Sequence, residues 1–131
     1  ARIVADSTST LAEFLGDWTP PSLDGTTVVA QPHCHHHAVM GWGADAALLR
    51  TAGAQVQRLG GCCGLAGNFG VERGHYDVSV AVAGAQLLPA VEAASADTVV
   101  LADGYSCRTQ IGDLTSRRGT HLAQLLASRL P

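Results

Sequence analysis

The stretch TTVVAQPHC, residues 26–34, decides the fold of this chain. Its β-branched residues favour an extended strand, and Pro32 ends that strand because proline cannot donate to a ladder of backbone hydrogen bonds. A cysteine follows two residues later. The same order recurs twice, since an alternating segment at 54–59 precedes a cysteine pair and an apolar segment at 98–102 precedes another cysteine. The sequence therefore predicts three strands, each running into a cysteine-bearing loop.

Helical patterns separate these strands. We expect helices at 11–18, where Ser9 and Thr10 can cap the start, at 44–52, closed by Gly53, and at about 75–94, where apolar residues recur every three or four positions. A short helix after Asp103 and a leucine-rich helix after Thr120 complete the pattern. Alternating strands and helices imply right-handed crossovers. We predict an α/β, three-layer, Rossmann-like sandwich with a parallel sheet of three or four strands and helices on both faces.

Length and composition limit the possible classes of protein. The 131 residues are 47% hydrophobic and only 15% charged, with a net charge of −3. The negative balance argues against nucleic-acid binding, and no apolar run reaches the roughly 20 residues of a transmembrane helix. The start has no signal-peptide pattern. We expect a helix and linker at 1–25 and one domain at 26–131, cut from a larger cytoplasmic protein that reaches the inner face of a membrane only through partners.

The four cysteines are the principal candidate site. Because the carboxyl ends of parallel strands meet at one edge of a sheet, Cys34, Cys62, Cys63 and Cys107 are expected to lie together. Four thiolates suffice for a four-iron cluster or a tetrahedral zinc ion. Two other readings stay open at this point: the cysteines are small buried apolar residues, or the adjacent pair carries out thiol–disulfide chemistry.

Polar residues beside the cysteines are secondary candidates. His33 and His35 flank Cys34 and can act as ligands or proton-transfer groups, although ordinary hydrogen bonding is the simpler role. Arg108 can neutralise a cluster or bind a carboxylate, with a surface salt bridge as the alternative. His75 and His121 stand at expected helix starts, where capping or packing is predicted.

The stretch from about 31 to 111 resembles the cysteine-rich CCG domain of iron–sulfur oxidoreductases. The matching pieces are PHCH at 32–35, GCCGLAGNFG at 61–70 and ADGYSCR at 102–108. Such domains occur in heterodisulfide reductase, in iron–sulfur subunits of glycolate oxidase and anaerobic glycerol-3-phosphate dehydrogenase, and in fused FAD-linked dehydrogenases of the D-lactate or D-2-hydroxyglutarate type. The resemblance implies an iron–sulfur cluster held by the cysteines, an FAD-binding dehydrogenase domain or subunit as partner, and a ferredoxin-like iron–sulfur domain nearby.

The chain departs from this family at one position. The family pattern commonly ends in CxxC, but Gln110 stands here where the second cysteine of that pair would be. A five-cysteine cluster is therefore disfavoured, and ligation by four cysteines, most simply of a 4Fe–4S cluster, is the leading hypothesis. Its alternative is a zinc-binding or metal-free interaction domain that packs on the flavin part. No catalytic residue is predicted in this chain, and it is not expected to turn over alone.

Overall fold

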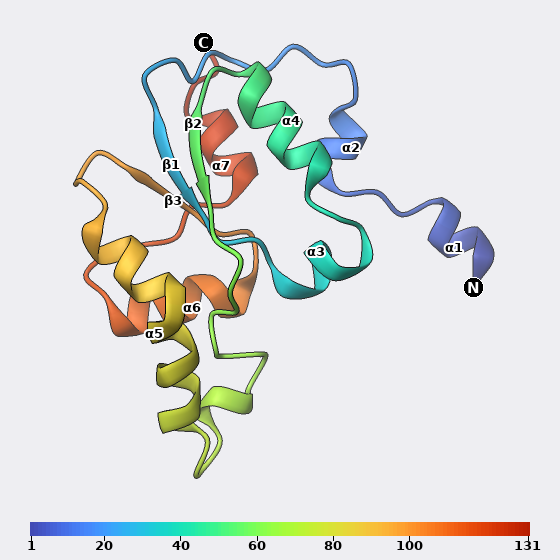
Figure 1. Ribbon diagram of the computed structural model, residues 1–131. Coiled ribbons are helices and arrows are strands. Elements are labelled where there is room, and N and C mark those ends of the chain that lie inside the picture. Colours follow the sequence, from blue (N-terminus) through green and yellow to red (C-terminus); the bar gives the residue numbers. More distant parts are fainter.

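The computed structural model describes residues 1–131 and contains one parallel sheet of three strands (Figure 1). The strands are β1 (Thr27–Ala30), β2 (Gln55–Arg58) and β3 (Val99–Leu101), in the order β2-β1-β3. Val28 of the central strand lies opposite Val56 on one side and Val99 on the other. The predicted parallel sheet is confirmed at its lower limit of three strands.

Seven α-helices and one 3₁₀ helix surround the sheet. They are α1 (Arg2–Asp6), α2 (Leu11–Leu15), α3 (Cys34–Val39), α4 (Gly43–Thr51), η1 (Phe69–Val71), α5 (Tyr76–Ala93), α6 (Tyr105–Leu114) and α7 (Leu122–Ala127). The sequence pattern predicts α2, α4, α5, α6 and α7. It does not predict α1, α3 or η1, because segments of five, six and three residues are too short to repeat an apolar period.

Helices cover both faces of the sheet, as predicted. Val28 and Ala30 of β1 share one core cluster with Leu49 of α4 and Leu125 of α7. Val29, between them in sequence, points to the opposite face because side chains alternate along a strand. It packs in a second cluster that includes residues of α5 and α6. Figure 1 shows α5 beside α6, and α4 in the same half of the molecule as α7.

Side-chain caps define the starts of two helices. Thr10 accepts a hydrogen bond from the backbone N–H of Glu13, whose carboxylate accepts one from the Thr10 N–H, which forms a capping box for α2. His121 and Gln124 form the same arrangement at α7. His75 lies at the N-cap position of α5 and its ring stacks on Phe69, with ring centroids 4.3 Å apart. The capping predicted for His121 and the packing predicted for His75 are both present.

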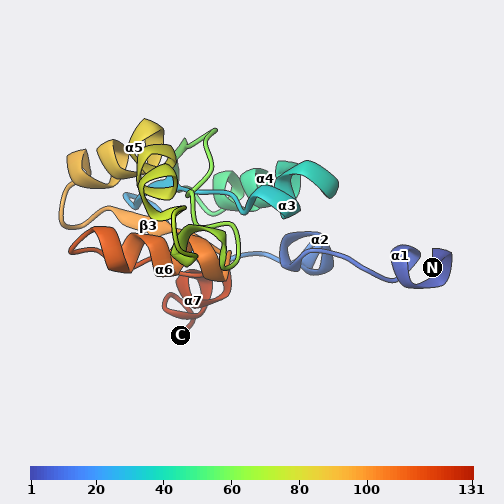
Figure 2. The same cartoon turned by 90° about the horizontal axis from the view of Figure 1, so that it is seen from below.

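The N-terminal segment divides into an exposed part and a packed part. α1 has no buried residue and stands apart from the rest of the chain in both views (Figures 1 and 2). α2 contributes Ala12 to the core, and Leu23 in the following linker is completely buried. None of the helices is both long and apolar enough to cross a membrane.

Candidate metal centre

The structure brings all four cysteines to one pocket with a volume of about 210 Å³. Cys34 is the first residue of α3, four residues after the end of β1. Cys62 and Cys63 lie in the loop that follows β2, and Cys107 is the third residue of α6, which follows β3. The three strands run in parallel, so their carboxyl ends deliver the three cysteine segments to the same edge.

The four thiols differ in how deeply they are buried. Cys63 and Cys107 are 2% and 1% exposed, whereas Cys62 is half-buried and Cys34 is exposed. All four are free thiols. Cys63 and Cys107 therefore form the inner wall of the pocket, and Cys34 lies on its outer side.

The loop that carries the cysteine pair turns its backbone N–H groups toward sulfur. Gly64 donates its N–H to Sγ of Cys62 at 3.3 Å, and the N–H groups of Leu65 and Ala66 donate to the Cys63 sulfur. Gly64 has a φ of 88° and Ala66 a φ of 48°, so the chain is left-handed at both positions. Amides arranged in this way stabilise negative charge on sulfur.

This environment separates the acidities of the thiols. The neighbouring Cys107 thiol is the main cause that lowers the pKa of Cys63 to about 6; burial opposes the shift and the backbone N–H groups reinforce it. Burial, followed by the adjacent Cys62, raises the pKa of Cys34 to about 11. The hydrogen bond to Cys63 and then burial raise the pKa of Cys107. At neutral pH the metal-free pocket thus holds a thiolate at Cys63 and neutral thiols at Cys34 and Cys107.

A pH titration of the reduced, metal-free protein checks this assignment. Ultraviolet absorbance should report about one thiolate per chain forming with a midpoint near pH 6, because lowering the pKa favours the ionised form above that pH. The variant C63S should lose this step, whereas C34S should retain it. A titration in which no thiolate forms below about pH 8, the ordinary cysteine range, would contradict the assignment.

The secondary candidates divide into residues at the pocket and residues away from it. His33 and His35 line the pocket, and Nδ1 of His33 also accepts a hydrogen bond from the backbone N–H of His36 at 3.4 Å. Arg108 does not line it, because its guanidinium donates to the backbone carbonyls of Ala102 and Asp103 and holds the turn between β3 and α6.

Gln110 also lies outside the pocket lining. It is 4% exposed, and its Nε2 donates to the Ser79 hydroxyl of α5 at 2.9 Å. The residue at the position of the missing family cysteine therefore connects α6 to α5.

Three further residues complete the pocket lining and are missed by the sequence analysis: Ala66, Gly67 and Ser106. Ser106 accepts a hydrogen bond from the Gly67 N–H at 3.1 Å, which ties the cysteine-pair loop to the start of α6. Their positions next to the cysteine motifs are the only sequence signal for this role.

Comparison with known proteins connects this geometry with oxidoreductases. A segment of 69 residues, 53% of this chain, is 42% identical to part of an anaerobic glycerol-3-phosphate dehydrogenase, in the form of one subunit of that enzyme from two strains of Escherichia coli. The chain spans 17% of the length of these relatives. No family model matches the chain, and no solved structure matches it. The similarity supports a redox-related role.

Proposed function

We propose that this chain is a CCG-type domain that binds an iron–sulfur cluster and transfers electrons within an FAD-linked oxidoreductase. The observation that carries the proposal is the convergence of Cys34, Cys62, Cys63 and Cys107 on one pocket from three separate segments of the chain. Four thiolates are a common ligand set for such clusters. The similarity to part of a dehydrogenase supports the same class of function.

The size of the pocket supports a polyatomic group. Its volume of about 210 Å³ is several times the roughly 30 Å³ that one water molecule occupies in the liquid. A single coordinated metal ion needs no cavity of this size, because its ligands close directly around it. The space between the thiols therefore suits a cluster of several atoms.

The spacing of the thiols supports the same conclusion. Zinc in a tetrahedral site binds sulfur at about 2.3 Å, which places the sulfur atoms about 3.8 Å apart. No three of the four cysteine sulfur atoms lie within 4.8 Å of one another. A cluster is larger than one ion and separates its ligands more widely, so this arrangement favours a cluster over zinc.

The residues of the chain would divide the work of holding the cluster. Cys63 enters as a thiolate, and the other three thiols lose protons when they bind, since the thiolate is the ligand form. The N–H groups of Gly64, Leu65 and Ala66 would remain directed at sulfur and favour added negative charge. When bound, a cluster of this kind supplies a carrier for single electrons. We propose a 4Fe–4S cluster, because four thiolates match its usual ligation.

The proposed partners follow from the same assignment. An FAD-binding dehydrogenase domain or subunit would deliver electrons from a 2-hydroxyacid or from glycerol 3-phosphate, and a ferredoxin-like iron–sulfur domain would exchange them with this one. The exposed side of Cys34 and the adjacent His35 leave one side of the pocket open toward such a partner.

Anaerobic reconstitution tests this function. The full chain is incubated with iron and sulfide under reducing conditions, desalted, and analysed for iron, acid-labile sulfide and visible absorbance. We expect about four irons and four sulfides per chain, broad visible absorbance, and a paramagnetic signal after reduction. One equivalent of zinc with a colourless protein that takes up no iron would contradict the cluster and favour a structural metal site.

A further inference from the structure

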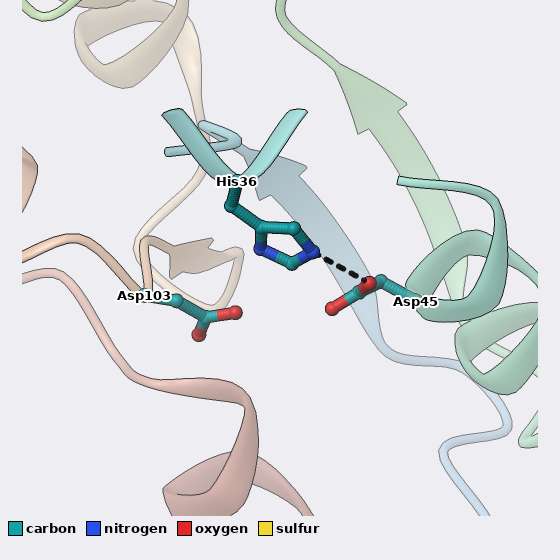
Figure 3. Close-up of side chains that lie close together, drawn as sticks. All are labelled: His36, Asp45 and Asp103. Atoms are coloured by element: carbon teal, nitrogen blue, oxygen red, sulfur yellow. Dashed lines mark ion pairs between the residues drawn. The ribbon is translucent and has the colours of Figure 1, made fainter. Parts of the chain in front are cut away.

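A second group of potential ligands lies on the other side of His33 from the thiols. His36 of α3, Asp45 of α4 and Asp103, which follows β3, place one ligand atom each within 4.8 Å of the other two. Figure 3 shows the imidazole ring of His36 between the two carboxylates, which approach it from different elements of the fold. The three residues come from separate parts of the sequence, so the fold itself assembles the group.

The innermost member of this group has no hydrogen-bond partner. Asp45 is 2% exposed, and its Oδ2 is a buried acceptor with no donor. Nε2 of His36, also buried and unsatisfied, faces it at 3.4 Å. Buried polar atoms are nearly always satisfied, and an unsatisfied one costs about 1–3 kcal/mol. Two such atoms facing each other indicate a missing ligand between them.

Asp103 directs a second carboxylate to the same point. Its Oδ1 accepts the Leu122 N–H at 2.7 Å and lies 3.8 Å from Nδ1 of His121, while its Oδ2 makes no hydrogen bond. Burial raises the pKa of the Asp45 carboxyl, His36 opposes that shift, and Asp103 adds to it. Two carboxylates brought together in a partly buried site repel each other, and a cation between them removes this repulsion.

We propose that His36, Asp45 and Asp103 bind a divalent first-row transition-metal cation, such as Mn²⁺, Fe²⁺ or Zn²⁺. One imidazole and two carboxylates form a mixed nitrogen and oxygen donor set, which suits these ions and lacks the soft sulfur ligands of the thiol pocket. Three protein ligands leave coordination positions free. A neighbouring pocket of about 310 Å³, lined by His33, His36, Asp103, Gly104 and Tyr105, gives water or a small anionic ligand access to them.

The site is separate from the thiol pocket. No cysteine belongs to its ligand group or to the lining of its access pocket, and His33 is the one residue that lines both pockets. Cation binding here therefore does not depend on the proposed cluster, and the two proposals can fail independently.

Titration with Mn²⁺ tests this site, because hard oxygen ligands favour Mn²⁺ and soft thiolates do not. Free Mn²⁺ gives a paramagnetic resonance signal that is lost when the ion binds, so the signal counts bound ions on the metal-free full chain. We expect one bound Mn²⁺ per chain and a higher melting temperature when Mn²⁺ is present. The substitutions D45N, D103N and H36Q should each weaken binding about tenfold or more, while C63S should bind as wild type does.

A matched control separates coordination from general charge. Asp97 is exposed in the turn before β3, so D97N removes the same charge without touching the site. D97N should leave Mn²⁺ binding unchanged. Absence of binding at millimolar Mn²⁺, or binding that D45N, D103N and H36Q leave intact, would overturn the proposal. Because D103N and H36Q alter partly exposed side chains, they decide the question even if D45N fails to fold.

Discussion

Replacement of Cys63 by serine is expected to remove about nine-tenths of the iron that the reconstituted protein binds. Cys63 is the thiol whose pKa falls to about 6, and its side chain lies at the inner wall of the pocket with Cys107. A serine hydroxyl does not ionise at neutral pH, so C63S loses the ligand that enters the site already charged. C107S should show a loss of similar size, measured as iron and sulfide per chain after desalting.

The exposed cysteine should behave differently from the inner pair. Cys34 is exposed and its pKa is raised to about 11, so its thiolate forms only when the metal displaces a proton. C34S should keep part of the iron when freshly reconstituted and lose it faster to a chelator, because its replacement opens the outer side of the pocket to solvent. Iron content and chelation rate would be measured on the same samples.

Ser106 supplies the matched control for these variants. It lines the same pocket but brings no thiol, and its hydroxyl accepts one hydrogen bond from the Gly67 N–H. S106A should therefore retain iron close to the wild-type amount. Equal loss in S106A and C63S would mean that iron uptake reports the integrity of the pocket. Unchanged iron in all four cysteine variants would exclude these residues as ligands.

The strands and the gathering of the cysteines are predictable because both follow from local patterns and one topological rule. The segments at 26–31, 54–59 and 98–102 contain the observed strands, which are about one residue shorter at each end. Parallel strands separated by helices place their carboxyl ends at one edge, so a cysteine after each strand suffices to predict a common location. No distance between the thiols is needed for that inference.

The roles of the charged and polar residues are not predictable in the same way, because they depend on contacts between distant segments. Gln110 contacts Ser79, 31 residues away, and no local pattern distinguishes this contact from a ligand role. Asp45 stands in the first turn of α4, where an acidic residue is usually a solvated partner of the helix dipole. Only the packing of α4 against α3 and the end of β3 buries it beside His36 and Asp103.

Gly64→Ala is expected to destabilise the protein by about 3 kcal/mol, which combines the cost of a left-handed alanine with that of overpacking. The φ of Gly64 is 88°, and a Cβ atom at this position would overlap the backbone carbonyl oxygen of Ser79 in α5. Neither backbone can move freely, since Gly64 adjoins the cysteine pair and Ser79 is buried. The melting temperature should fall by about 10 °C, and iron uptake should fall with it.

Gly74→Ala separates the two causes, because Gly74 has nearly the same backbone angle in open space. Its φ is 91°, and a Cβ atom there would meet no atom within 4 Å. G74A should therefore cost only the strain of the left-handed conformation, about 1 kcal/mol, and leave iron uptake unchanged. Equal melting temperatures for G64A and G74A would show that the approach of the cysteine loop to α5 relaxes at little cost. A larger loss in G64A would mean that Gly64 holds the two thiols of the pair in place through this close contact.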